Sequence, residues 1–229
     1  MMMKTNLFLV GFLLFLFSNH SSYAQQETAA ISYLALGDSY TIGESVLESE
    51  RWPMQLALRL EEDGMQIRQP NIIAKTGWRT DELLQAMQEQ LGDKKYDLVS
   101  VLIGVNNQYQ GVELSVYKKE FKEILEKAIP YGEQGKRSVF VLSIPDYGVT
   151  PFGKESDKKN ISKEVRAYNK AARKIAKEME VSFYDITPIS KKAAQDLSLV
   201  AEDELHPSGK MYALWVEKIY TKIQQIVLR

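Results

Sequence analysis

LALGDSYT, residues 34–41, runs from an apolar segment into a sharp turn. The run 31–36 is apolar and partly β-branched, so it predicts a buried strand, and Gly37 and Asp38 predict the turn that ends it. Ser39 therefore stands where a strand is expected to pass into a helix. A Gly-Asp-Ser turn alone indicates only loop structure. A chemical role for the serine hydroxyl also requires a base, a group that orients the base and donors for an oxyanion.

The rest of the chain alternates strand-like and helix-like segments. It contains no linker rich in Pro, Gly or Ser, which favours a single domain over residues 25–229. The segments 98–103 and 139–142 are almost continuously apolar, as is typical of parallel strands covered by helices on both faces. The expected strands are 31–36, 71–75, 97–104, 138–143 and 181–186.

Helical patterns lie between these strands, at 52–62, 81–91, 115–129 and 162–180. A last helix is expected from about Pro207 to Val227, because proline suits the first position of a helix. Five strands with crossover helices imply an α/β fold, a three-layer α/β/α sandwich around a five-stranded parallel sheet. The last helix carries a stripe at four-residue spacing that indicates core packing, formed by Met211, Trp215, Ile219 and Ile223.

The first 24 residues have the pattern of a secretory signal peptide. Lys4 precedes an apolar run at 7–17, and the small residues Ser22 and Ala24 suit a cleavage site before Gln25. The apolar run is short for a bilayer span, and no later stretch is long and apolar enough to cross a membrane. We therefore expect a cleaved, secreted or periplasmic protein, with an uncleaved membrane anchor as the alternative.

Charge and cysteine content exclude several classes of function. Without residues 1–24 the chain holds 28 basic and 30 acidic residues, and this balance gives no electrostatic surface for nucleic acid. The chain has no cysteine, which excludes disulfides and thiolate chemistry. His20 lies in the proposed signal peptide, so the mature chain would contain one histidine, His206. A metal hydrolase is disfavoured because only carboxylates would remain as further ligands.

The residues that follow the expected strands are candidates for a site, because ligands of parallel α/β sheets bind beyond the carboxyl ends of the strands. Ser39 follows the first strand, Gly77 the second and Asn106 the third. Asp146 and Tyr147 follow the fourth. This pattern locates a site without naming its chemistry.

His206 is the candidate base for Ser39, since the unperturbed pKa of imidazole lies near neutrality. Asp203 precedes it by three residues, a spacing at which a turn brings a carboxylate onto the imidazole Nδ1 atom. Glu202 and Glu204 are rivals for this role, although neighbouring side chains of a turn point elsewhere. A solvated acidic loop that ends in a helix-capping histidine is the purely structural alternative.

Three groups are candidate oxyanion donors. The backbone N–H of Ser39 lies at an expected helix N-terminus. Gly77, in KTGWRT, lets the chain approach a substrate closely because it lacks a Cβ atom. Asn106, in IGVNN, offers its side-chain amide. Each of these residues would also suit an ordinary turn, so the argument depends on their combination.

These blocks together resemble the GDSL, or SGNH, hydrolases, a family named for a serine, a glycine, an asparagine and a histidine in separate blocks. The resemblance covers essentially the whole mature chain and implies the flavodoxin-like SGNH hydrolase fold. ALGDSYTIGE is similar to the nucleophile block with Ser39 as nucleophile, and Gly77 falls in the glycine block. IGVNN is similar to the asparagine block with Asn106 as donor, and DELH to the last block with Asp203 and His206.

The sequence departs from the family pattern at two positions. Tyr40 stands where the family name has leucine, and Asn107 stands where aspartate often follows the asparagine. These departures concern the subgroup, because neither position carries a catalytic atom. A Gly-x-Ser-x-Gly elbow would instead indicate an α/β-hydrolase, but Thr41 occupies the place of the last glycine.

The resemblance implies a serine esterase that hydrolyses carboxylic esters through a Ser-His-Asp triad and an acyl-enzyme, without a cofactor or metal. It points to the branch with lysophospholipase and thioesterase-like members, and the substrate could be a lipid, a short-acyl ester or an acetylated carbohydrate. An acyltransferase to a sugar or lipid hydroxyl and a non-catalytic binding module are the alternatives. Loop residues after the strands are candidates to line the substrate pocket, namely Trp78, Tyr109, Asp146, Tyr147 and Phe152.

Overall fold

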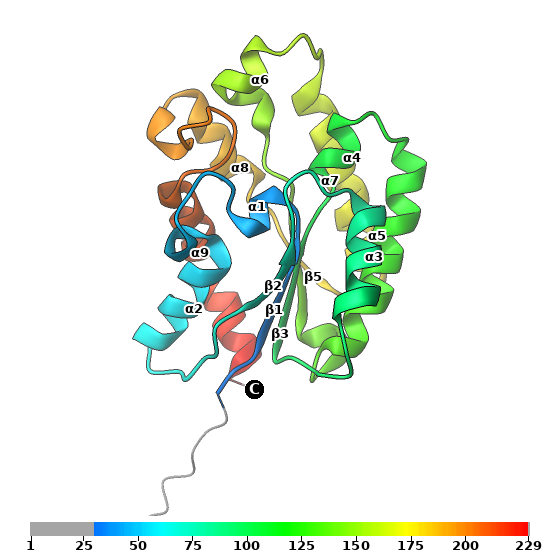
Figure 1. Cartoon of the computed structure of the whole chain (residues 1–229), viewed down its shortest axis with the longest axis vertical. Helices are drawn as coiled ribbons and strands as arrows, with labels where there is room; N and C mark the ends of the chain where they lie inside the picture. Colours follow the sequence, from blue (N-terminus) through cyan, green and yellow to red (C-terminus); the bar gives the residue numbers. More distant parts are fainter. Residues whose placement is uncertain (1–29, 229) are drawn as a thin grey trace, which may run out of the picture.

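The computed structural model describes residues 30–228 (Figure 1). The proposed signal peptide, residues 1–24, lies outside the described residues. Five parallel strands form one sheet in the order β2-β1-β3-β4-β5. The strands are β1 (Tyr33–Gly37), β2 (Asn71–Ala74), β3 (Leu98–Leu102), β4 (Val139–Leu142) and β5 (Ser182–Tyr184).

The predicted three-layer α/β/α sandwich is confirmed. On one face of the sheet α2 (Trp52–Glu62) packs against α9 (Gly209–Val227), and on the other α5 (Leu114–Ala128) packs against both α3 (Thr80–Gln90) and α7 (Ile161–Glu178) (Figure 1). All residues of the central strands β1, β3 and β4 are buried, whereas the edge strands β2 and β5 are partly exposed. Continuous apolar runs therefore belong to the strands that are covered on both faces.

Short helices occupy the connections at the carboxyl ends of the strands. They end or redirect the chain where it leaves the sheet, and sequence periodicity did not predict them because four or five residues make little more than one turn. They are α1 (Ser39–Ile42), α4 (Val105–Tyr109), α6 (Pro151–Glu155) and α8 (Thr187–Ser190). The connections also contain 3₁₀ turns, two of which, Ile129–Tyr131 and Gly135–Arg137, precede β4. The others are Glu48–Glu50, Tyr147–Val149, Lys191–Ala194 and Leu197–Leu199.

The expected start of the last helix is wrong by two residues. Pro207 does not occupy the first helical position; it pairs with Val200 in an isolated antiparallel bridge. Ser208 is the N-cap, and its Oγ accepts a hydrogen bond from Met211 N at 3.4 Å. A capping serine satisfies a free N–H of the first turn, which proline at the same end cannot do. The predicted core stripe of this helix is confirmed, since Met211, Trp215, Ile219 and Ile223 are all buried.

The strand order reverses between β1 and β3, because the chain runs to β2 on one side of β1 and to β3 on the other. In open parallel sheets, the crevice beyond the carboxyl ends of two such strands is the usual place for a ligand. Ser39, in α1, lies two residues past the end of β1, and Asn106, in α4, lies four residues past the end of β3. Among residues 30–228, we find no helix with the length and apolarity that a membrane span needs.

Candidate active site

Ser39 is the first residue of α1 and lies in a tight elbow after β1. Ser39 is buried, with 4 % of its surface exposed. The turn needs glycine at position 37, because a Cβ atom there would lie 2.2 Å from Thr41 Oγ1 and 2.5 Å from the Leu102 carbonyl oxygen. Asp38 caps the helix by accepting a hydrogen bond from Tyr40 N at 3.0 Å. This close packing fixes the place of Ser39 above the carboxyl end of the sheet.

The carboxylate of Asp203 meets the imidazole of His206, as the three-residue spacing predicted. Asp203 Oδ2 lies 2.6 Å from His206 Nδ1. The other oxygen, Oδ1, accepts hydrogen bonds from His206 N at 2.9 Å and Leu205 N at 3.0 Å. Within the described part of the chain, the carboxylates of Glu202 and Glu204 form no hydrogen bond with this imidazole. A backbone turn thus holds the carboxylate in place while Oδ2 orients the ring.

A fourth donor reaches the Asp203 carboxylate from another part of the chain. Ser45 Oγ donates a hydrogen bond to Asp203 Oδ2 at 2.6 Å. Partial burial raises the pKa of Asp203, but the hydrogen bonds from Ser45, His206 and Leu205 outweigh it and lower the pKa to about 2. The carboxylate is therefore ionised at neutral pH and acts as an acceptor toward the imidazole.

Ser39 and His206 line the same cavity, which has a volume of about 200 Å³. The structure records no direct hydrogen bond between Ser39 Oγ and His206; in sites without substrate, such contacts are often long and tighten only when substrate binds. One wall is aromatic: the ring centroid of Tyr109 lies 6.2 Å from that of Tyr147 and 6.4 Å from that of Phe152. The cavity is lined by Ser39, Thr76, Gly77, Val105, Asn106, Tyr109, Tyr147, Phe152, Leu205 and His206.

Both candidate oxyanion donors outside the elbow border this cavity. Gly77 has a φ of +85°, in the left-handed region that glycine adopts without strain. Apart from its two chain neighbours, no described residue lies within 4 Å of where a Cβ atom would stand. Asn106 Nδ2 donates a hydrogen bond to the Trp78 carbonyl oxygen at 3.0 Å. Because an amide nitrogen carries two hydrogens, this contact orients the group and leaves a second N–H available.

Two of the predicted lining residues do not belong to the cavity lining. Trp78 is half-buried against the hydrophobic core, and its part near the site is the carbonyl that orients Asn106. Asp146 is buried on the other side of its loop, where Oδ1 accepts hydrogen bonds from Ser162 Oγ at 2.9 Å and Gly148 N at 3.1 Å. Tyr147, Tyr109 and Phe152 do line the cavity.

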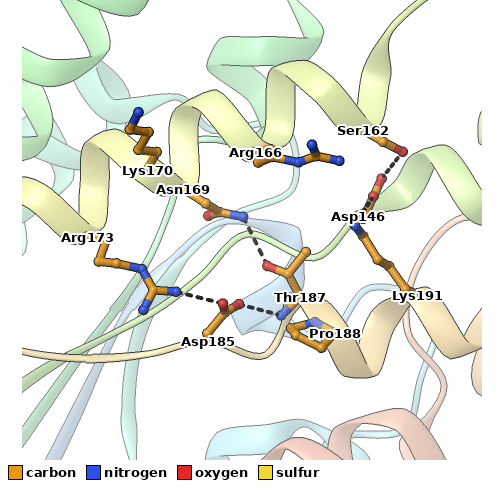
Figure 2. Close-up of a pocket in the computed structure, with 10 residues that line it drawn as sticks. All are labelled: Asp146, Ser162, Arg166, Asn169, Lys170, Arg173, Asp185, Thr187, Pro188 and Lys191. Atoms are coloured by element: carbon orange, nitrogen blue, oxygen red, sulfur yellow. Dashed lines mark hydrogen bonds and ion pairs between the residues drawn. The ribbon is translucent and has the colours of Figure 1, made fainter.

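A larger cavity, of about 510 Å³, lies between α7 and the segment that begins α8 (Figure 2). No histidine of residues 30–228 lines it, and its carboxylates already have cationic partners. Arg173 Nη2 lies 2.6 Å from Asp185 Oδ2, and Lys191 Nζ lies 3.7 Å from Asp146 Oδ2. Figure 2 shows Lys170 and Arg166 pointing in different directions rather than toward one point. The smaller cavity, although it is not the largest, is the one that brings together the residues predicted from sequence, Ser39, Gly77, Asn106 and His206.

Sequence reasoning did not identify Thr76, Val105, Leu205 or Ser45. The first three are chain neighbours of Gly77, Asn106 and His206, so a search of the positions beside each candidate would have found them. Ser45 has no such signal, because its contact with Asp203 spans 158 residues of sequence.

Asp38, next to Ser39, is a fully buried carboxyl group. Oδ1 accepts the hydrogen bond from Tyr40 N, whereas Oδ2 has no hydrogen-bond partner in the described part of the chain. Burial raises the pKa of Asp38 to about 7, and backbone hydrogen bonds oppose this rise only in part. Near neutral pH, this group is therefore protonated in a substantial share of molecules.

Comparisons with known proteins agree with this fold. Residues 35–214 match the model of the GDSL-like Lipase/Acylhydrolase family. A comparison with curated protein sequences gives no match. Among solved structures, TesA is 16 % identical with a TM-score of 0.68, covering 85 % of this chain and 99 % of its own. The lipase Lip_vut3 from a goat rumen metagenome is 22 % identical with a TM-score of 0.68, covering 84 % of this chain and 97 % of its own.

A third similar structure is the acetylxylan esterase Axe2 from Geobacillus stearothermophilus, 18 % identical with a TM-score of 0.66, covering 84 % of this chain and 94 % of its own. At these identities the solved structures establish the fold alone. The family match spans most of the chain and includes all four blocks around the cavity. The chain therefore belongs to the GDSL-like lipase/acylhydrolase family and is a hydrolase that acts on ester bonds.

Proposed function

We propose that this hydrolase is a serine esterase in which Ser39 is the nucleophile, His206 the general base and Asp203 the group that orients His206. The observation that carries the proposal is the meeting of four distant segments in one cavity, represented by Ser39, Gly77, Asn106 and His206. The 2.6 Å contact between Asp203 and His206 supports the assignment of the base, because it leaves Nε2 as the ring nitrogen that can accept a proton.

The first half of the reaction forms an acyl-enzyme. His206 Nε2 takes the proton of Ser39 Oγ as this oxygen attacks the ester carbonyl carbon. The negative charge then moves to the carbonyl oxygen, where Ser39 N–H, Gly77 N–H and the free N–H of Asn106 would stabilise it. When the tetrahedral intermediate collapses, the bond from carbon to the alcohol oxygen breaks, and the protonated imidazole gives its proton to the leaving alcohol.

Water completes the cycle. His206 removes a proton from the water molecule as it attacks the acyl carbon, and the same donors hold the second oxyanion. Collapse releases the carboxylic acid and returns the proton to Ser39 Oγ. The ionised Asp203 stabilises the imidazolium in both halves of the reaction. Because the pKa of Asp203 is low, its carboxylate carries this negative charge over the whole neutral range.

Cavity size supports a short acyl group as substrate. The volume of about 200 Å³ is below the ~300–1,000 Å³ that is typical of pockets for drug-sized ligands. The aromatic wall of Tyr109, Tyr147 and Phe152 would favour an apolar acyl group over a charged one. We infer that acetyl or another short chain enters the cavity while the alcohol part of the ester stays at its mouth.

Hydrolysis of p-nitrophenyl acetate by the wild type and by Ser39→Ala tests the assignment. We expect the variant to lose activity and to lose labelling by a fluorophosphonate probe. Turnover of Ser39→Ala at the wild-type rate would contradict the proposal. Acetylated xylan, a p-nitrophenyl ester series and lysophospholipid then distinguish the substrate classes, and product analysis with and without a carbohydrate acceptor distinguishes hydrolysis from acyl transfer.

We also propose that the protein is exported, to the periplasm or outside the cell, after cleavage before Gln25. The proposal rests on the charge and apolar pattern of residues 1–24. N-terminal sequencing of the exported protein tests it. A first residue of Gln25 is expected, and an intact Met1 would contradict cleavage.

A further inference from the structure

Ser45 lies in the connection after α1 and has an unusual backbone conformation. Its φ is +63°, a region that residues other than glycine and asparagine seldom occupy. Among residues 30–228, the other non-glycine residues with positive φ are Asn160, Glu180 and Glu204. Glu204 follows Asp203 directly in the chain, and Ser45 contacts Asp203 through space. Two of the four left-handed residues therefore adjoin one carboxylate, and such conformations often concentrate at functional sites.

Among the hydrogen bonds that residues 30–228 make to the Asp203 carboxylate, this contact is the one from outside its own turn. Oδ1 is held by the backbone N–H groups of Leu205 and His206, and Oδ2 is shared by His206 Nδ1 and Ser45 Oγ, each at 2.6 Å. The Asp203 side chain is 29 % exposed, so water competes for its oxygens. A second donor on Oδ2 limits the rotation of the carboxylate and keeps this oxygen aimed at the imidazole.

Ser45 also connects the two halves of the site. It lies six residues after Ser39, on the segment that α1 begins, whereas Asp203 and His206 lie on the loop before α9. The Ser45 hydroxyl thus ties the nucleophile's segment to the segment of the base. Ser45 and Asp203 both lie at the surface, so neither side chain is needed to fill the core.

We infer that Ser45 is a positioning residue for ester hydrolysis. It acts through Asp203 on His206 and keeps the imidazole aligned with Ser39. The inference rests on the proposed roles of Ser39, Asp203 and His206. In its left-handed conformation, Ser45 directs Oγ to Asp203 Oδ2. Without the hydroxyl, the carboxylate has more rotational freedom, and less of its charge is neutralised by hydrogen bonding.

These two effects predict different observables. Greater freedom of the carboxylate lowers kcat, on the order of tenfold, which is less than the ~10²-fold that a 1 Å misplacement of a catalytic group can cost. A carboxylate with one donor fewer stabilises the imidazolium more strongly. The acidic limb of the plot of kcat/KM against pH should therefore move upward. A merely structural serine would not produce this shift.

Two substitutions separate the hydroxyl from the backbone conformation. Ser45→Ala removes Oγ and keeps a Cβ atom at positive φ, whereas Ser45→Gly removes Oγ and also relieves the strain. We expect both to fold, to lower kcat by a similar factor and to raise the acidic limb. If only the backbone conformation matters, Ser45→Gly will match or exceed the wild type, and that result would overturn the inference.

A matched control lies nearby. Ser198 Oγ donates to Asp196 Oδ1 at 2.5 Å, so it is also an exposed serine on an aspartate, but it contacts no proposed catalytic residue. Ser198→Ala should keep the wild-type kcat and pH profile. Ser39→Ala in the same assays separates a failure of the inference about Ser45 from a failure of the proposed function. If Ser39→Ala is inactive and both Ser45 variants behave as wild type, the inference about Ser45 fails alone; if Ser39→Ala is active, the proposed function fails as well.

Discussion

Asp203 Oδ2 lies 2.6 Å from His206 Nδ1, while Asp203 Oδ1 accepts the backbone N–H of the same histidine at 2.9 Å. One carboxylate therefore holds both the ring and the backbone of His206. In Asp203→Asn, the oxygen can keep the backbone contacts, but an amide N–H toward Nδ1 would favour the wrong ring tautomer. We expect kcat for p-nitrophenyl acetate to fall on the order of 10⁴-fold, the size of the effect in a serine protease triad.

The neighbouring acid Glu202 provides the control for this prediction. It is exposed and precedes Asp203 in the chain, yet its carboxylate forms no hydrogen bond with His206 in the structure as described for residues 30–228. Glu202→Gln removes one charge from the same loop and should leave kcat near the wild-type value. An equal loss in both variants would assign the effect to loop charge and not to orientation of the imidazole.

Asn106 and Asn107 are adjacent, but they serve different parts of the molecule. Asn106 borders the cavity, whereas the buried Asn107 accepts from Thr80 N at 3.1 Å and donates to Thr80 Oγ1 at 2.6 Å. Asn106→Ala should lose on the order of 10²-fold or more in kcat with little change in KM, since the oxyanion exists only in the transition state and intermediates.

Asn107→Ala should show the opposite profile. It leaves the buried N–H of Thr80 without its partner at the start of α3, although Thr80 Oγ1 still donates to Glu120, and this costs about 1–3 kcal/mol of unfolding free energy. Thermal melting should therefore occur at a lower temperature, while kcat per folded molecule stays close to wild type. Loss of kcat in Asn107→Ala without loss of stability would show that the two roles are not separated as proposed.

Asp38 should make the protein less stable as pH rises toward neutrality. Burial raises its pKa from 3.8 to about 7 in the folded chain, so between about pH 4 and 7 the folded state binds a proton that the unfolded state has lost. Its contribution to stability is full below pH 4 and disappears as pH rises through 7. A difference of this size corresponds to roughly 4 kcal/mol. The tyrosines coupled to it, Tyr40, Tyr117 and Tyr212, have raised pKa values and stay neutral in this range.

Urea unfolding at pH 5 and pH 8 measures this contribution. The wild type should lose more unfolding free energy between the two pH values than Asp38→Asn, which cannot ionise and keeps an oxygen for Tyr40 N. Asp203→Asn is the control, and between pH 5 and pH 8 its unfolding free energy should respond to pH as that of the wild type does. The pKa of Asp203 is lowered to about 2, so its stabilisation is present above about pH 4 and is lost only as pH falls toward 2. An identical pH response of wild type and Asp38→Asn would contradict the prediction.

The sheet could be predicted from sequence because its central strands are covered on both faces. The apolar runs of β1, β3 and β4 have no solvent side, so they stand out from the helices around them. The helix Trp52–Glu62 was predicted with its observed bounds, since its apolar periodicity extends over several turns. The start of α9 was not, because the Ser208 cap and the Val200–Pro207 bridge compete with proline's own preference.

Within the site, the local contacts were predictable and the long-range contacts were not. Asp203 reaches His206 through a three-residue turn, which spacing alone describes. The strand-end rule placed Asp146 at the correct edge of the sheet, but its side chain turns away to Ser162. Side-chain direction after a strand depends on the packing of the loop, and sequence spacing does not contain that information. The contact of Ser45 with Asp203 depends on the same kind of tertiary arrangement.

We expect Phe152 to limit the acyl group that the cavity accepts. It lies on α6 and forms one wall, and α6 is attached to the His206 loop through its backbone, with Phe152 N donating to the Glu204 carbonyl oxygen at 3.2 Å. Phe152→Ala keeps this backbone contact while it enlarges the cavity. We expect the ratio of kcat/KM for p-nitrophenyl octanoate to that for acetate to rise on the order of tenfold, because even one methylene group in an apolar pocket changes kcat/KM by ~10-fold or more.

Phe183→Ala, at a half-buried phenylalanine of β5 outside the cavity, should leave the ratio unchanged. If Phe152→Ala keeps the wild-type ratio, the acyl chain does not enter along this wall, and the small cavity cannot be the reason for a short-chain preference.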